Sequence, residues 1–160
     1  MTLGQWADVA QIALPVIAGI AAYIALKQWS DTRKHAVQDR TYAFVARTNN
    51  YDFAALQASA LAYLRSAPPD LGDMQQGERL QVAHMCNVYE EIAIHYNADR
   101  LDKRTIWTLL EVIAVQAWIE ASRFIDYSRQ EYGDAAYAEW ERMMTSFQSL
   151  RIDSAIAEAS

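Results

Sequence analysis

The side chains best suited to hold a metal ion are His84, Glu91 and His95. Glu91 and His95 are four residues apart, so on a helix both could contact one ion. His84 lies two turns further back, about 10 Å along the helix axis, too far to join them. Two ligands do not make a zinc site, and no other His, Cys or Asp completes the pattern. We therefore predict no metal and no other cofactor, and interpret the three residues as a solvated helix face.

Arg79 and His84 form an R-x4-H motif. Its spacing resembles the motif of HEPN ribonucleases, in which an Arg and a His meet across a dimer to cleave RNA. Small membrane accessory proteins of RNA-guided CRISPR systems carry a related motif and assemble into pores. The resemblance implies that Arg79 and His84 are catalytic, although the HEPN motif usually lies nearer the end of its domain. The simpler interpretation is an Arg at a helix start and a surface His.

Glu111 lies in the most apolar segment, residues 106–119. A buried carboxylate has either a raised pKa or a cationic partner, and both can mark a site. The more ordinary outcome is an ion pair between two helices, for which the candidate partners are Arg79, Arg104 and Arg123. We find no Gly-rich phosphate loop, no Ser-His-Asp pattern and no H-E-x-x-H motif, which disfavours an enzyme and leaves the question open.

The elements that position these residues begin with an apolar run at residues 9–26, in which Gln11 is the only strongly polar side chain. A membrane span needs about 20 apolar residues, with about 17 near the lower limit. Trp6 and Trp29 bracket the run, as expected at two headgroup zones. Positive charges occur only on its C-terminal side, at Lys27, Arg33, Lys34 and Arg40.

This pattern predicts a single-pass protein of the inner (cytoplasmic) membrane with its N-terminus outside. Residues 1–29 would form the anchor, and residues 30–160 a cytoplasmic helical bundle. A secretory signal peptide is disfavoured because no basic n-region precedes the run. A rival interpretation is a soluble binding protein whose first helix is buried against the rest of the bundle.

Small residues mark one surface of the first helix: Ala18, Gly19, Ala22 and Ala25. Such residues let neighbouring helices approach closely in a membrane. Asp8 and Gln11 are three residues apart and lie near one helical stripe. Polar groups at membrane depth usually face a protein interior or a water path. A homo-oligomer that buries these six residues, with a pore at its centre, is therefore one hypothesis. The simpler interpretation is that Asp8 lies in the outer headgroup region and needs no partner, which leaves Gln11 open.

The remainder of the chain reads as helices. No Gly or Pro occurs between Gly19 and Pro68, and Asn49-Asn50 is the one weak point before a loop at residues 67–73. A third helix is expected over residues 78–97, and spacings of three and four place six residues on its apolar face: Val82, Met85, Cys86, Tyr89, Ala93 and Tyr96. Asp102 should cap a fourth helix that ends at Gly133 and forms the centre of the bundle, and Asp134 should cap a fifth. No stretch alternates with period two, so the predicted fold is all-α, with about four helices in the bundle.

Composition narrows the possible partners. The net charge is −6 and the pI about 5.0, without a basic patch, so nucleic acid is disfavoured as a partner. The single cysteine, Cys86, excludes an internal disulfide framework and fits a reducing compartment. We expect it to be buried and inert.

The stretch NVYEEIAIHYNADRLD, residues 87–102, resembles the bacterial domain of unknown function 4760 family. That family shares a plan of a short N-terminal membrane helix, a basic helix and a helical domain. Its recognisable positions correspond here to Asn87, Tyr89, Glu90 or Glu91, Ile92-Ala93 and Asp102, with Trp118 and Arg123 downstream. The turn N-A-D-R departs from the commoner Gly-containing form. The resemblance implies no known activity.

A structural role explains Asn87, Glu90, Glu91 and Asp102 without any activity, because polar groups near a core usually satisfy one another. They could fix the angle between the third and fourth helices. The leading hypothesis is thus a non-enzymatic, membrane-anchored protein that self-associates and interacts with an unidentified protein partner. A role as an effector or pore in bacterial stress or defence follows only by analogy. The alternatives are a HEPN-like ribonuclease and a soluble helical binding protein.

Overall fold

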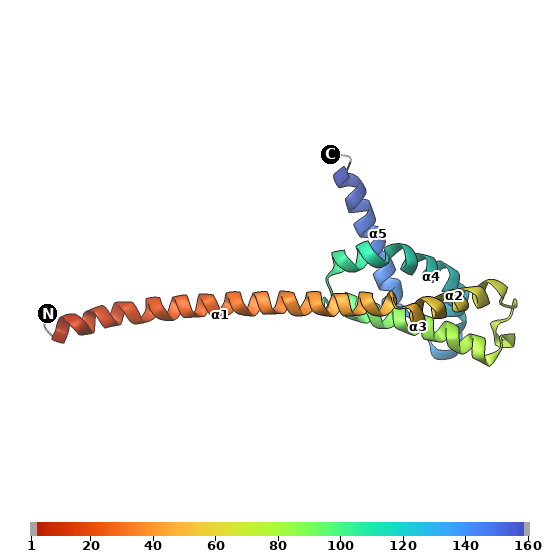
Figure 1. The fold of residues 1–160 in the computed structure, drawn as a ribbon, viewed down its shortest axis with the longest axis horizontal. Coiled ribbons are helices and arrows are strands. Elements are labelled where there is room, and N and C mark those ends of the chain that lie inside the picture. Colours follow the sequence, from red (N-terminus) through yellow and green to blue (C-terminus); the bar gives the residue numbers. More distant parts are fainter. Residues whose placement is uncertain (1–2, 159–160) are drawn as a thin grey trace. The chain divides into compact units, whose positions relative to one another are not determined.

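A computed structural model describes the backbone of residues 3–158 and the surroundings of the side chains of residues 18–152. Within these residues the fold is all-α, as predicted, with five α-helices, one short 3-10 helix and no strand (Figure 1). The elements in chain order are α1 (Leu3–Thr48), α2 (Tyr51–Ser66), η1 (Leu71–Asp73), α3 (Gln76–Asn97), α4 (Lys103–Tyr132) and α5 (Ala138–Glu158). The chain divides into two compact units after Gln38, and each is described by itself.

Short polar side chains set several helix starts. Asn50 separates α1 from α2, and its side chain accepts a hydrogen bond from the Asp52 N–H, which confirms the predicted weak point. Asp102 caps α4 as predicted, because its Oδ1 accepts the Thr105 N–H at 2.7 Å. The same helix ends at Gly133, whose φ of 94° is one that glycine adopts at low cost.

The predicted cap of α5 is wrong. Asp134 lies in a turn, and α5 begins only at Ala138. The first N–H groups of α5 bond instead to Glu90, a residue of α3. A local capping rule could not find this partner because it is almost fifty residues away in the chain.

The core of the second unit lies around α3. Its predicted apolar face is buried throughout, and α3 contacts α2, α4 and α5. Of the four residues that the sequence predicts to face inward on the fifth helix, Trp140, Met144 and Phe147 are buried, whereas Tyr137 lies in the turn before α5 and is only half-buried. Residues 39–48 of α1 belong to this unit, and the buried Thr41 hydroxyl accepts the Asp102 N–H at 2.8 Å.

The prediction that α4 is the enclosed centre of the bundle is wrong. This helix buries one face, including Ile106, Leu110 and Ile125. Its opposite face leaves Leu109, Val112 and Ile119 exposed, although they are as apolar as the buried residues. The three helices that contact α4 do not cover its whole circumference. An apolar surface therefore remains uncovered in the described chain.

The predicted membrane localisation is contradicted. No helix in the described part of the chain is long and apolar enough to cross a membrane, so the N-terminal transmembrane helix is unsupported and the single-pass topology is wrong. Asp8 and Gln11 lie outside the residues with described side chains.

Candidate functional site

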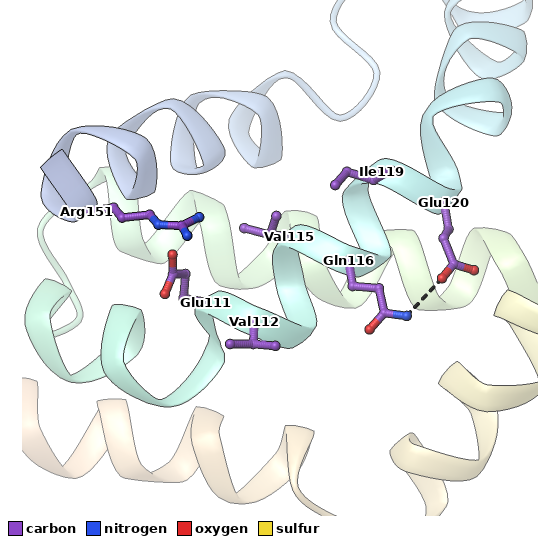
Figure 2. Close-up of a pocket in the computed structure, with 7 residues that line it drawn as sticks. All are labelled: Glu111, Val112, Val115, Gln116, Ile119, Glu120 and Arg151. Atoms are coloured by element: carbon purple, nitrogen blue, oxygen red, sulfur yellow. Dashed lines mark hydrogen bonds between the residues drawn. The ribbon is translucent and has the colours of Figure 1, made fainter.

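An apolar groove lies along the uncovered face of α4. It encloses about 400 Å³, and its lining comes from α4 and from one residue of α5: Glu111, Val112, Val115, Gln116, Ile119, Glu120 and Arg151 (Figure 2). Val112 is 75% exposed and Ile119 63% exposed. Exposed apolar patches that are rimmed by polar residues mark interaction sites. The groove is therefore the candidate binding surface of this unit.

The edge of the groove carries fixed charges. Glu120 accepts two hydrogen bonds from Arg65 of α2, at 2.7 and 2.6 Å, and a third from Gln116 at 3.0 Å. The bond to the Arg65 guanidinium holds the pKa of the Glu120 carboxyl below its ordinary value. Glu120 is therefore a stable anion at this rim at neutral pH.

Glu111 lies half-buried at the groove rather than inside the core. In Figure 2 its side chain and that of Arg151 on α5 point toward each other. The arginine that faces Glu111 is therefore Arg151, and not one of the candidates that the sequence suggested, Arg79, Arg104 and Arg123. The groove lining combines carboxylates, a guanidinium, an amide and aliphatic side chains.

The polar motif of residues 87–102 supports the arrangement of helices. Both Glu90 carboxylate oxygens accept hydrogen bonds from the start of α5, from the Glu139 N–H at 3.2 Å and the Trp140 N–H at 2.7 Å. Burial raises the pKa of Glu90, and these two bonds oppose the rise. Glu90 thus joins α3 to α5, whereas the sequence suggested a joint between α3 and α4.

Aromatic residues complete the same joint. Tyr89 stacks on Trp140 with ring centroids 4.7 Å apart and planes 12° apart. Trp118 of α4 meets Trp140 edge-on at 5.2 Å. Asn97 donates to the Glu139 carbonyl at 2.9 Å, one residue before Trp140. The family-like residues Tyr89, Glu90 and Trp118 therefore converge on one point of α5.

The other motif residues lie apart from this joint. Glu91 forms an exposed ion pair with Arg47 at 2.8 Å, and Asn87 is exposed. Arg123 donates to the carbonyls of Pro68 and Pro69, at 2.9 and 3.0 Å, and so ties the loop before η1 to α4. These contacts are structural, and none of them forms a catalytic arrangement.

Arg79 and His84 are not brought together within one chain. Arg79 lines a hollow between α3 and α4, where its guanidinium donates to the Tyr127 hydroxyl at 3.4 Å. His84 lines a different hollow, beside Arg47 and Phe53. No observation on the described chain favours the ribonuclease hypothesis.

The metal-like set is also dispersed. His95 packs against the Phe44 ring at 5.0 Å, whereas Glu91 pairs with Arg47. Among the described residues no group of three or more His, Cys, Asp or Glu side chains is arranged to hold a metal ion.

The small-residue surface of the first helix lies on α1. Ala18, Gly19, Ala22 and Ala25 are all exposed, and open space surrounds Gly19. Larger apolar residues share this exposed segment, including Ile20, Tyr23 and Ile24. A helix of the first unit thus also presents an uncovered apolar surface.

These features define an all-α protein that carries an apolar groove on one face of α4. The family described as "Domain of unknown function (DUF4760)" matches residues 15–147, and the chain belongs to this family. The resemblance seen in residues 87–102 is therefore confirmed, while the membrane anchor attributed to the family is not. Neither a curated protein nor a solved structure matches the chain.

Proposed function

We propose that this chain is a non-enzymatic helical interaction protein that self-associates. In this proposal the groove on α4 binds residues 18–38 of α1 from a second copy. The observation that carries it is the presence of two uncovered apolar helix surfaces on one chain: Val112 and Ile119 on α4, and Ile20 and Ile24 on α1, which are 55% and 48% exposed.

Each surface gains from being covered. Burial of apolar area is favourable by about 25 cal/mol per Å². Helices in proteins gain most of their stability from the packing of an apolar face, so the exposed apolar residues 18–26 would gain from a partner. Ile20 and Ile24 are neighbours on one face of α1. Alanines beside them, such as Ala21 and Ala25, leave room for a close approach.

Charge favours the same pairing. The groove lining contains two carboxylates, Glu111 and Glu120, and one guanidinium. The α1 segment, residues 18–38, contains three basic residues and one acidic one: Lys27, Arg33, Lys34 and Asp31. Arg65 and Arg151 face these two carboxylates, so the attraction between a basic helix and the rim is small, and salt weakens it further.

Cysteine mapping tests the pairing. The only native cysteine, Cys86, is buried and its pKa is raised by burial, so it contributes little background. One full-length preparation carries Ile24→Cys and a second carries Ile119→Cys. After mixing and mild oxidation, we expect a disulfide-linked dimer that contains one chain of each kind, measured by mass spectrometry of the cross-linked peptides.

Ile94 provides the matched control, because it is an exposed isoleucine on α3, away from the groove. Ile94→Cys should not cross-link to Ile24→Cys. Dimers of Ile24→Cys alone would show that α1 pairs with α1, and dimers of Ile119→Cys alone that α4 pairs with α4. Either result, or a monomer by sedimentation at every concentration, contradicts the proposed pairing.

A further inference from the structure

We infer that the hollow between the start of α3 and the end of α4 binds a small monoanionic carboxylate with a flat apolar body. This hollow is separate from the groove and encloses about 320 Å³, near the lower end for small-molecule sites. Its lining includes one arginine and several aromatic rings: Arg79, Phe124, Tyr127, Tyr132 and Tyr137.

Arg79 supplies the anion recognition. Its guanidinium has five N–H donors. The hydrogen bond that it donates to the Tyr127 hydroxyl is long, at 3.4 Å. Other arginines on the described surface, such as Arg65 and Arg129, pair with carboxylates, whereas no ion pair of the described residues includes Arg79. A planar guanidinium with free donors matches a carboxylate in a bidentate arrangement.

The aromatic lining defines the rest of the ligand. Tyr127 and Phe124 lie 6.4 Å apart in a tilted arrangement, and Tyr137 and Leu80 add apolar surface. The two rings are in contact with each other, so a ligand ring would pack against the exposed side of Tyr127 and the neighbouring apolar surface, not between the two rings. Tyr137 remains a neutral phenol, since burial raises its pKa above the ordinary value.

Backbone strain coincides with this hollow. Tyr137 has a φ of 59°, in the left-handed region that residues other than glycine rarely adopt. The turn that holds it there is fixed by Arg129, whose Nε donates to the Ala136 carbonyl at 3.1 Å. Strained residues that the surrounding structure holds in place occur often at ligand sites.

Glu131 selects the charge of the ligand. It lines the same hollow, so the lining carries one positive and one negative side chain. A doubly charged phosphate ester would gain from Arg79 and be repelled by Glu131. The opposite charges of Arg79 and Glu131 largely cancel, so the lining offers little net attraction to offset the larger desolvation cost of a dianion, and a monocarboxylate is preferred.

Ligand-detected NMR on the full-length chain tests the inference with three probes. Benzoate is the expected ligand, benzamide its neutral counterpart and phenyl phosphate its dianionic counterpart. We expect benzoate to bind more tightly than both. If benzamide binds as tightly as benzoate, the charge of the ligand plays no part in recognition. If phenyl phosphate binds more tightly than benzoate, the hollow binds phosphates and not carboxylates.

Substitutions locate the binding. Arg79→Gln should weaken benzoate binding by about tenfold to a hundredfold, because it removes a charge-assisted hydrogen bond. Arg104→Gln, at an exposed arginine of α4 outside the hollow, should leave it unchanged. Tyr132 is 81% exposed, so Tyr132→Ser preserves the core and should weaken binding severalfold. Benzoate binding that survives both substitutions in the hollow, or no binding to the unsubstituted chain, overturns the inference.

Discussion

The helices α3 and α4 are both rich in apolar residues, but they use them differently. The apolar face of α3 is covered by three neighbouring helices, and Glu90 of this helix also bonds to the first N–H groups of α5. In contrast, α4 buries one face and leaves Val112 and Ile119 in solvent. Stability therefore concentrates around α3, whereas α4 offers apolar surface that the chain itself does not use.

The polar groups of the two helices differ in the same way. Glu90 on α3 is bonded to backbone groups of another helix and fixes its position. On α4, Glu111 and Glu120 stand at the rim of the groove. Polar residues near α3 therefore maintain the fold, whereas the exposed face of α4 combines an ion pair to α2, Glu120 with Arg65, with a half-buried Glu111 at the groove.

The largest expected effect comes from Trp140, at the joint of α3, α4 and α5. Trp140→Ala should lower the free energy of unfolding by about 3–5 kcal/mol, because the side chain is fully buried and contacts both Tyr89 and Trp118. Urea denaturation measures the loss. Ile119→Ala, on the exposed face of α4, should change stability by less than about 0.5 kcal/mol. Equal losses would abolish the contrast between the two helices.

A smaller effect is expected at Glu90. Glu90→Ala leaves the N–H groups of Glu139 and Trp140 without this acceptor, so we expect a loss of about 1–3 kcal/mol in urea denaturation. Asp126→Ala, at an exposed carboxylate of α4, is the control and should be nearly neutral. A neutral Glu90→Ala variant would show that α5 is positioned by its apolar contacts alone.

The pH dependence of stability sharpens the role of Glu90. Its pKa is raised in the folded state, chiefly by burial, so the folded chain favours the protonated carboxyl. The protonated carboxyl therefore contributes to the free energy of unfolding. This contribution is fully present below the ordinary pKa and is lost as pH rises through the folded-state pKa. Glu90→Gln cannot ionise, so its stability relative to the unsubstituted chain should increase between pH 4 and pH 7. A constant difference across this range would contradict the raised pKa.

The smallest effect is expected at Asp102, the cap of α4. Asp102→Ala should lower stability by about 1 kcal/mol at pH 7, a usual value for a lost N-terminal cap. Hydrogen bonds from Thr105 lower the pKa of Asp102. Its contribution is therefore present above the ordinary pKa and disappears as pH falls through the folded-state pKa. The difference in stability between Asp102→Ala and the unsubstituted chain, measured by thermal unfolding, should be smaller near pH 3 than at pH 7. An equal difference at both pH values would show that the ionised carboxylate of Asp102 is not its cause.

Several parts of the fold followed from local sequence signals. The break at Asn50, the cap at Asp102 and the stop at Gly133 each depend on a side chain and its neighbours within four residues. The apolar face of α3 followed from spacings of three and four. Such features form within one helix, so the order of residues alone specifies them.

The candidate sites were less predictable. A helix that is apolar nearly all round predicts burial on every side, yet α4 remains open at Ile119. Arg151, across from Glu111, comes from a helix whose packing the sequence does not specify. Arg79 was selected for its spacing to His84, but its notable neighbours are the tyrosines of α4, more than forty residues away.

The sequence by itself determined the helices, most of their ends, the buried face of α3 and the family, because each depends on residues close together in the chain. Only the tertiary structure decided that Glu90 caps α5, that one face of α4 stays uncovered and that Arg79 lies among aromatic rings. Those outcomes depend on which helices pack together and on how much surface they cover. The spacing of apolar side chains indicates that a helix has an apolar face, but the number and direction of the neighbouring helices decide whether that face is buried.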